Sequence, residues 1–250
     1  MIDKLIENIQ KEINLTMEET EQLFDKIFKG EIDTHSLVDL LDALDKKGET
    51  PEELAGATTS MRKNAKLIDV NHDQIVDCCG TGGLGKKIIN ISTSVSFVLA
   101  AAGLKVAKHG NRTATGKSGS ADFLEAAGIN LKKSSENFSN SLDKIGLGFL
   151  FAQNHHPGMK YVMDARKILG KKTIFNLLGP LSNPAGANIQ SIGVFHNKWI
   201  KPVAEALRNL NCKAAAIFHS DDGLDEISFT STTQMIELFQ NKLTNHEIDP

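Results

Sequence analysis

The amino-acid sequence predicts an α/β protein with two parts: a small all-helical domain, and a larger α/β domain with a mostly parallel central sheet. Three observations lead to this fold class. The first 70 residues carry only helical spacings of apolar residues. From Gln74 onward, short apolar runs alternate with helical segments, which is typical of a parallel sheet covered by helices. Between Pro157 and Pro184 the pattern turns helical again.

The N-terminal segment contains clear signals for the beginning and end of helices. Thr16 and Glu19 form a predicted capping box in front of apolar residues at helical spacing, and Gly30 ends that helix. A leucine-rich helix then ends at Gly48. The run TPEE begins the next helix, because it supplies an N-cap, a proline in the first turn and a glutamate three residues after the cap. No residue of this segment has an evident catalytic pattern, so we expect a helical accessory or dimerisation domain.

The α/β domain is predicted from five short apolar strands with helices between them. The strands are expected over 75–79, 104–107, 148–152, 189–195 and 214–219. The helices are expected over 91–102, 120–127, 157–169 and 173–178. Ligands of such sheets bind at the carboxyl ends of the strands. The glycine loop after Cys79 and the HGNR run after Ala107 both fall there.

Turn-rich runs mark where the chain is expected to cross between the two domains. QNHHPG and GPLSNPAG flank the second helical stretch. We therefore expect residues 1–70 to form the first part of the helical domain and 71–153 the ligand-binding part of the α/β domain. Residues 154–186 would return to the helical domain, and 187–250 would continue the α/β domain.

Composition excludes several classes of protein. The net charge of −3 argues against a basic protein that binds nucleic acid or a membrane surface. The three cysteines are odd in number and lack CxxC spacing, which argues against a disulfide framework or a zinc site and fits the reducing cytoplasm. No apolar run reaches the ~18 residues of a membrane span, and the charged amphipathic N-terminus does not resemble a signal peptide.

The charge distribution is uneven along the chain. No acidic residue occurs between Cys78 and Ala121, a window of 44 residues in which the overall composition predicts between five and six. The same window holds five lysines, Arg112, His109 and eight glycines. Glycines expose backbone N–H groups and the basic side chains supply charge, so the window indicates a site for an anion of phosphate size.

The loop GTGGLGKK is a candidate phosphate cradle, because glycine lets the backbone approach an anion closely. It matches neither the GxxxxGK[ST] of P-loops nor the GxGxxG of dinucleotide-binding folds. The NIST run that follows places Asn90, Ser92 and Thr93 at the beginning of a helix, where hydroxyls and free amides attract anions. Ordinary helix capping is the alternative interpretation of Ser92 and Thr93.

The run KHGNR places cationic and polar groups at a strand end. Lys108 and Arg112 supply charge, although a solvated surface run is the common alternative. His109 could position a substrate carboxylate or could make a hydrogen bond within the loop. The run KSGS begins the next helix and gives a further N-terminal site for an anion.

An acidic run, HSDDGLDE, lies at the opposite end of the α/β segment, where Asp225 and Glu226 follow a glycine turn beyond a strand. Such turns are common on protein surfaces. Hard carboxylate oxygens also suit Mg²⁺, which commonly uses one or two carboxylates and takes its other ligands from water and substrate phosphates. A cationic cradle with a separate carboxylate pair would suit a metal–pyrophosphate.

Seven motifs together resemble the anthranilate phosphoribosyltransferase family of tryptophan biosynthesis. In order, they are DCCGTGG, NIST, KHGNR, KSGSAD, HHPGMK, RKILGKKTIFNLLGPLSNPA and DGLDEIS. The resemblance covers essentially the whole chain. It implies a fold like that of nucleoside phosphorylases and phosphoribosyltransferases. It also implies transfer of a phosphoribosyl group from 5-phosphoribosyl 1-pyrophosphate to the amine of anthranilate, by a cytoplasmic homodimer that binds neither nucleic acid nor a membrane.

The resemblance also implies site residues. Phosphoribosyl pyrophosphate would be bound by Gly80, Gly83, Leu84, Ile88, Asn90, Ile91, Ser92, Thr93, Lys108, His109, Gly110, Asn111, Arg112, Thr113, Ala114, Thr115, Gly116 and Ser120. Anthranilate would be bound by Gly80, Asn111 and Arg166, with His109 and Pro180 nearby. Mg²⁺ would be bound by Ser92, Asp225 and Glu226. Lys108 and His109 would act electrostatically, and no residue is implied as an acid or base.

The sequence departs from the family pattern in three respects. Leu84 stands where the family usually has aspartate, and Ile88 where it usually has threonine, so two polar groups are missing beside the diphosphate and metal. Family members normally continue well beyond Pro250, so we expect a C-terminally truncated chain. Two alternatives stay open: a pyrimidine-nucleoside phosphorylase that uses inorganic phosphate without metal, and a non-catalytic paralogue that binds nucleic acid or a regulator.

Overall fold

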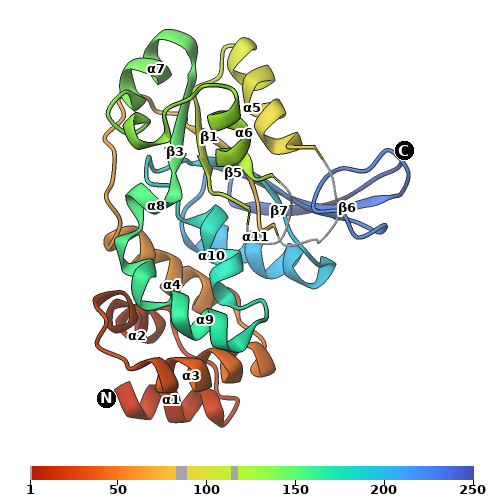
Figure 1. Ribbon diagram of the computed structural model, residues 1–250. Coiled ribbons are helices and arrows are strands. Elements are labelled where there is room, and N and C mark those ends of the chain that lie inside the picture. Colours follow the sequence, from red (N-terminus) through yellow and green to blue (C-terminus); the bar gives the residue numbers. More distant parts are fainter. Residues whose placement is uncertain (1, 83–88, 114–117) are drawn as a thin grey trace.

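A helical bundle and an α/β part make up the molecule. The structure is a computed structural model of the 250-residue chain, and it describes residues 2–82, 89–113 and 118–250. The bundle lies at one end, with the sheet and its covering helices at the other (Figure 1). The predicted fold class, a helical domain with a larger α/β domain on a mostly parallel sheet, is confirmed.

The bundle begins with four helices, as predicted for this segment. They are α1 (Ile2–Gln10), α2 (Met17–Lys29), α3 (Thr34–Lys47) and α4 (Pro51–Lys63). Both capping boxes form, at Thr16 with Glu19 and at Thr50 with Glu53. Gly30 follows α2 with φ +73°, a left-handed conformation that glycine adopts without strain.

The second helical stretch packs with this bundle. It contains α8 (Ala152–His155), a 3₁₀ turn (Pro157–Tyr161), α9 (Met163–Leu169) and α10 (Ile174–Leu181). The prediction of one continuous helix over 157–169 was wrong, because its first turn lies tightly against α2. A Cβ added to Gly158 would lie 2.9 Å from the Cβ of Phe28. The chain divisions at residues 70, 153 and 186 stay a prediction.

The sheet has the strand order β3-β2-β1-β4-β5-β6-β7. Its strands are β1 (Val76–Gly80), β2 (Val106–Gly110), β3 (Leu147–Phe151), β4 (Ile189–Gly193), β5 (Ala214–Ser220), β6 (Thr233–Phe239) and β7 (Lys242–Ile248). The first five run parallel and correspond to the five predicted strands, within three residues at each end. The antiparallel hairpin β6–β7 was not predicted. Its turn contains Gln240 and Asn241, both with positive φ.

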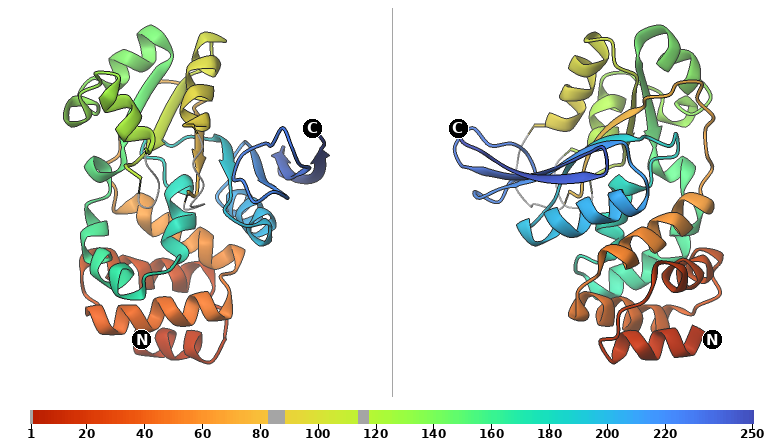
Figure 2. Two further views of the ribbon diagram at one scale, coloured as in Figure 1. Left: turned by 45° about the vertical axis from the view of Figure 1, so that its right-hand side comes forward. Right: turned by 180° about the vertical axis from the view of Figure 1, so that it is seen from behind.

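One hydrophobic core connects the bundle to the sheet. The buried cluster that contains Phe24 of α2 and Leu54 of α4 also contains Leu207 of α11 (Ile200–Asn209) and Ile217 of β5. Helices α4 and α11 lie side by side in both views of Figure 2. Because the two parts share this core, the position of the helical bundle relative to the strand ends is fixed by apolar packing.

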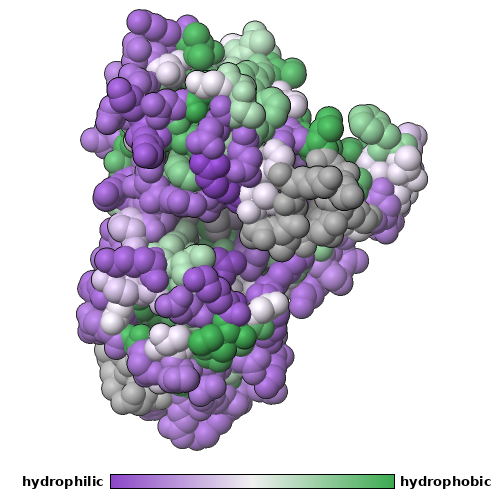
Figure 3. Space-filling view, viewed as in Figure 1, coloured by the Kyte–Doolittle hydropathy of each residue, from purple (hydrophilic) through white to green (hydrophobic). Residues whose placement is uncertain are grey.

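The remaining helices cover the sheet. They are α5 (Ile91–Ala101), α6 (Ser120–Ala126), α7 (Phe138–Ile145) and two 3₁₀ turns, Leu131–Lys133 and Asn197–Trp199. Helix α5 buries the polar residues Thr93 and Ser96 and exposes Val95, Phe97 and Val98, which contribute to the apolar surface over this helix (Figure 3). Its hydroxyl-bearing side therefore faces the sheet. No helix in the described part of the chain is long and apolar enough to span a bilayer.

Glu49, between α3 and α4, should make stability depend on pH. It is buried, its Oε2 has no hydrogen-bond partner among the described residues, and burial raises its pKa to about 7. Between the unfolded pKa of 4.5 and 7 the folded state binds more protons, so the free energy of unfolding falls as pH rises through this window. The full effect is about 3 kcal/mol. Glu49→Gln should be more stable than wild type at pH 8, and equally stable at pH 4.5.

Chemical denaturation at both pH values measures this difference. Glu52→Gln is the matched control, since Glu52 is an exposed acid at the beginning of α4. A stabilisation by Glu49→Gln that is the same at both pH values would contradict the explanation through ionisation.

Candidate functional site

Loops from four parallel strands meet at the carboxyl edge of the sheet. The glycine loop follows β1, the HGNR segment ends β2, Gly193 ends β4, and the acidic loop follows β5. Parallel pairing of β2, β1, β4 and β5 places these four ends on the same edge. The sequence segments predicted to hold a phosphate and a metal are therefore neighbours in the fold.

Asp225 lies against the ends of β1 and β4. Its Oδ2 accepts a hydrogen bond from the Gly82 N–H at 3.2 Å, and a Cβ added to Gly80 would lie 3.0 Å from the same oxygen. A Cβ added to Gly193 would lie 1.8 Å from the Asp225 carbonyl oxygen. Glycine at these two strand ends thus lets the acidic loop approach the glycine loop, and burial raises the pKa of Asp225.

Glu226 follows Asp225 in the acidic loop, and the backbone N–H of Ser92, in the first turn of α5, bonds to it. Burial, together with the charge of Asp225, raises its pKa to about 7, while Lys108 and a hydrogen bond from the Ser92 backbone act in the opposite direction. The acidic loop is braced internally, since the Ser220 hydroxyl donates to the Glu226 carbonyl and pairs with the Thr233 hydroxyl. The three predicted metal ligands, Ser92, Asp225 and Glu226, are thus brought together.

The chemistry of this donor set fits Mg²⁺. Two adjacent carboxylates with raised pKa values are costly to keep charged in a buried site, and a divalent cation would stabilise their ionised forms. No group of three or more His, Cys, Asp or Glu side chains that could hold a metal occurs among the described residues. The protein would offer oxygen ligands from Asp225, Glu226 and Ser92, and Mg²⁺ commonly takes its other ligands from water and phosphate.

Lys108 is almost completely buried, with 2% of its surface exposed. Its ammonium donates to the carbonyl of Cys78 and lies 3.4 Å from the Ser92 hydroxyl. The positive charge is therefore held under the first turn of α5, where the helix dipole adds to it. The ammonium of Lys108 is thus a buried positive charge held in place by hydrogen bonds, unlike that of a mobile surface lysine.

The hydroxyls that follow the glycine loop connect α5 to α6. Thr93 Oγ1 donates to Ser120 Oγ at 3.1 Å, and Asn90 Nδ2 donates to Ser118 Oγ at 3.1 Å. The Asn90 side chain makes no cap hydrogen bond to α5. The hydroxyls of Thr93 and Ser92, for which capping was the alternative interpretation, thus contact Ser120 and Lys108, and the N-termini of α5 and α6 lie next to each other at the site.

Arg112 turns away from the strand ends toward α6. Its guanidinium forms ion pairs with Asp122 at 2.9 Å and Glu125 at 2.8 Å. Asn111 accepts through Oδ1 from the Arg112 N–H at 2.8 Å and from Gln153 Nε2 at 3.3 Å. The charge of Arg112 is thus already balanced within the protein, and the Asn111 side chain is exposed.

His109 is neutral, so the electrostatic role that the family resemblance implied would not come from a charged imidazole. Burial and the neighbouring His156 lower its pKa well below the ordinary value. His109 Nδ1 lies 3.2 Å from the carbonyl of Gly179, which can only accept, so Nδ1 carries the proton. Nε2 then accepts from His156 Nε2 at 3.3 Å, and His156 Nδ1 has no partner among the described residues. His109 is therefore a hydrogen-bonding residue at the boundary between the two parts.

Arg166 lies on α9, in the helical part, and is half-buried. Its Nη2 donates to Asn176 Oδ1 at 3.2 Å, and burial lowers its pKa from the ordinary value. Asn176 and Gly179 are three residues apart on α10, so they lie on the same side of that helix. Because the Gly179 carbonyl bonds His109, helix α10 contacts both Arg166 and the HGNR segment.

Sequence reasoning missed Asp77 and Asn183. The Asp77 side chain is 1% exposed and accepts from the His109 backbone N–H at 3.1 Å and from Asn183 Nδ2 at 2.8 Å. Asn183 also donates to the carbonyl of Ala107 at 2.8 Å. Burial raises the pKa of Asp77 to about 6. An acid inside the apolar run IVDCC was the available signal, since a buried carboxylate must have hydrogen-bond partners.

Some of the other residues predicted to bind the substrates lie in segments that the structure describes, and some lie outside them. Ile91 is the first residue of α5, Gly110 ends β2, and the Thr113 N–H donates to Asp122 Oδ2 at 3.1 Å. Pro180 is buried within α10. The positions that lie outside the described residues are Gly83, Leu84, Ile88, Ala114, Thr115 and Gly116.

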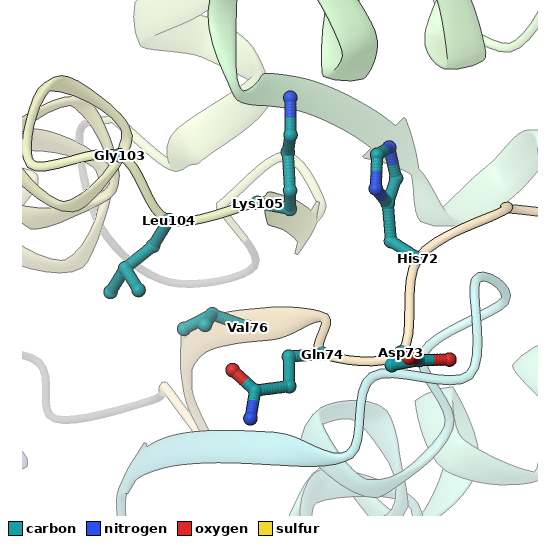
Figure 4. Close-up of a pocket in the computed structure, with 7 residues that line it drawn as sticks. All are labelled: His72, Asp73, Gln74, Val76, Gly103, Leu104 and Lys105. Carbon is teal, nitrogen blue, oxygen red and sulfur yellow. The ribbon is translucent and has the colours of Figure 1, made fainter.

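A pocket at the opposite edge of the sheet is not part of this site. It is lined by residues at the amino ends of β1 and β2, among them His72, Gln74 and Lys105 (Figure 4). Lys105 donates to the carbonyls of Leu142 and Asp143 on α7. Its ammonium is therefore used to hold α7 in place, and parallel sheets bind ligands at the other edge.

Family models match nearly the whole chain. Residues 1–65 match the helical bundle domain of a glycosyl transferase family, and residues 72–250 match the α/β domain of a glycosyl transferase family. Among curated proteins, the anthranilate phosphoribosyltransferase of Vibrio parahaemolyticus is 43% identical over 249 residues, which is 100% of this chain and 75% of that protein. The enzyme of the same name from Desulfatibacillum aliphaticivorans is 44% identical and is covered to 74%.

Solved structures agree with these matches. Anthranilate phosphoribosyltransferase from Thermus thermophilus superposes with a TM-score of 0.91 at 37% identity, over 98% of this chain and 73% of that one. The Saccharomyces cerevisiae enzyme in complex with PRPP and Mg gives a TM-score of 0.81 at 27% identity, over 94% and 68%. The yeast enzyme in complex with 4-fluoroanthranilate gives 0.83 at 26% identity, over 100% and 73%.

Proposed function

Because this chain belongs to the anthranilate phosphoribosyltransferase family, we propose that it transfers the phosphoribosyl group of 5-phosphoribosyl 1-pyrophosphate to the amine of anthranilate. The products are N-(5-phosphoribosyl)anthranilate and pyrophosphate. The bond from ribose C1 to the pyrophosphate oxygen breaks, the bond from C1 to nitrogen forms, and the amine loses a proton. The reaction is a pentosyl transfer of a glycosyltransferase.

One observation supports the proposal most directly. The carboxylates of Asp225 and Glu226 converge with Ser92, Lys108 and the Gly82 N–H at the carboxyl ends of β1 and β5. This places a cationic helix N-terminus beside a carboxylate pair, which is the combination that a magnesium diphosphate requires. When bound, Mg²⁺ would neutralise charge that develops on the leaving pyrophosphate.

The residues of the chain would mainly bind and orient. The charge of Lys108 and the N–H groups at the beginning of α5 are fixed before the donor arrives, so they stabilise the leaving group without further reorganisation. An arylamine attacks as the neutral amine, so no strong general base is needed. Holding the two substrates in line then supplies much of the rate enhancement.

Anthranilate would be oriented by one residue of the helical part and one of the α/β part. The guanidinium of Arg166 can bind the carboxylate of anthranilate with two parallel hydrogen bonds, and Asn111 offers an exposed amide near the strand end. The neutral His109 keeps α10 against β2 through Gly179. Acceptor and donor would therefore meet where the helical part faces the carboxyl edge of the sheet.

The test is consumption of anthranilate, followed by its fluorescence, with phosphoribosyl pyrophosphate in the presence and absence of Mg²⁺. We expect consumption that requires both the donor and the metal, with release of pyrophosphate. Phosphorolysis of a pyrimidine nucleoside with inorganic phosphate, without metal, would instead support the phosphorylase alternative. The homodimer and the cytoplasmic location stay predictions from the family resemblance.

Arg166→Ala should raise the KM for anthranilate about 10- to 100-fold and change the KM for the donor much less, because it removes one charge-assisted contact to the acceptor. Lys167→Ala is the control, since Lys167 is exposed on the same helix and pairs with Asp164. Steady-state kinetics with each substrate varied in turn measure both constants. An equal rise in the KM values for both substrates would contradict a contact between Arg166 and anthranilate.

A further inference from the structure

Lys172 reaches from the helical part to the α/β part. It lies in the turn between α9 and α10, two residues before Ile174, which with Phe175 is buried in the core shared with the bundle. Its ammonium lies over the ring of Phe195, 3.9 Å from the ring centroid. Phe195 follows β4, so Lys172 bridges the two parts at the carboxyl edge of the sheet.

Phe195 is hydrogen-bonded directly to the beginning of the glycine loop. Its N–H donates to Thr81 Oγ1 at 2.9 Å, and the Thr81 N–H donates to the carbonyl of Gly193 at 2.9 Å. The next residue, Gly82, holds the carboxylate of Asp225. Lys172 therefore contacts Phe195, which is hydrogen-bonded to Thr81 at the beginning of the glycine loop. The residue after Thr81 is in turn hydrogen-bonded to the carboxylate of Asp225.

The charge of Lys172 is only partly compensated. The side chain is half-buried, and burial lowers its pKa, while the charge of Asp225 acts in the opposite direction. Among the residues that the structure describes, the ammonium forms no ion pair with Asp225 and its three N–H donors have no hydrogen-bond acceptor. The ring of Phe195 supplies about 1 kcal/mol of cation–π attraction, which does not use these donors.

We propose that Lys172 binds the diphosphate end of the donor from the side of the helical part. This rests on the proposed function and adds a residue to it. A half-buried ammonium with unused donors is suited to phosphate oxygens, and Asp225 acts on it through its charge rather than through an ion pair. Binding there would connect the helical part, through α10, to the loop that holds the leaving group.

Lys172→Met tests this role, because methionine keeps an apolar side chain over Phe195 and removes the charge. The KM for phosphoribosyl pyrophosphate should rise about tenfold, the KM for anthranilate should change less than twofold, and calorimetric affinity for pyrophosphate with Mg²⁺ should fall about tenfold. Lys172→Arg should restore both values to within about threefold. If the methionine variant does not fold, Lys172→Gln carries the same expectations.

Lys171→Met is the matched control. Lys171 is the preceding residue, but its ammonium pairs with Asp42 at 2.8 Å and Asp45 at 2.6 Å on α3, away from the strand ends. Its variant should keep both KM values and the pyrophosphate affinity of wild type. Any loss of thermal stability should be similar in the two methionine variants.

The outcomes separate this inference from the proposed function. A donor KM and a pyrophosphate affinity that are unchanged by Lys172→Met, in a protein whose wild type turns over, would overturn the role of Lys172 alone. An equal rise in the KM values for both substrates would do the same. A wild type that neither consumes anthranilate nor binds pyrophosphate would overturn the proposed function itself.

Discussion

Glu226→Gln is expected to lower turnover about a hundredfold or more, which is the size of effect seen when one electrostatic stabiliser is removed from an active site. Glutamine keeps the shape of the side chain and removes half of the negative charge of the Asp225–Glu226 pair. The remaining carboxylate would hold a divalent cation beside the leaving pyrophosphate far less strongly. Initial rates at saturating substrates, measured over a range of Mg²⁺ concentrations, give the size of the loss.

Binding measurements separate this explanation from misfolding. Calorimetric affinity for pyrophosphate in the presence of Mg²⁺ should fall together with turnover, while thermal stability should be retained. Asp221→Asn makes the same charge change in the same loop at an exposed position, and it should behave like wild type. If Asp221→Asn lost as much activity as Glu226→Gln, the net charge of the loop, rather than the position of Glu226, would be responsible.

Gly193→Ala is expected to displace the acidic loop and to lower both stability and activity. The added Cβ would lie 1.8 Å from the carbonyl oxygen of Asp225 and 2.6 Å from its carbonyl carbon. Both are backbone atoms, so the clash cannot be relieved by a rotamer change, and the loop or the end of β4 must move. We expect a loss of about 1–3 kcal/mol in the free energy of unfolding, and at least a tenfold loss of turnover.

Gly179→Ala is the control for the backbone effect of the substitution. A Cβ at Gly179, within α10, would meet no atom within 4 Å, and alanine favours the helix. Its thermal unfolding should therefore match or exceed that of wild type. A Gly193→Ala protein with wild-type turnover and stability would show that Asp225 does not lie against the end of β4.

The local sequence was sufficient to predict most helices and strands and their order. Both capping boxes form where they were predicted, and the five parallel strands lie within three residues of their predicted ends, because caps, periodicity and turn residues act over a few neighbours. Two features were not predicted from the sequence: the antiparallel hairpin β6–β7, and the break in the helix that was expected over 157–169. The second depends on a contact between Gly158 and Phe28, which are far apart in the sequence.

In the candidate site, too, some residues were predictable from the sequence and others depend on contacts between distant segments. Ser92, Asp225 and Glu226 were identified through the family motifs, and the structure brings them together. The neutral state of His109 was not predictable, because it results from burial against His156, 47 residues away. The role of Asp77 was not predictable either, because its hydrogen-bond partner Asn183 follows α10 and is 106 residues away in the sequence.

The sequence by itself determined which chemical groups are present and at which strand ends and helix beginnings they occur. Tertiary structure decided which of them meet and in which state of charge. It placed the ammonium of Lys172 over Phe195 and that of Lys171 against α3, although the two residues are adjacent. The physical reason is that burial and electrostatic interaction depend on distances across the fold, whereas capping and periodicity depend on distances along the chain.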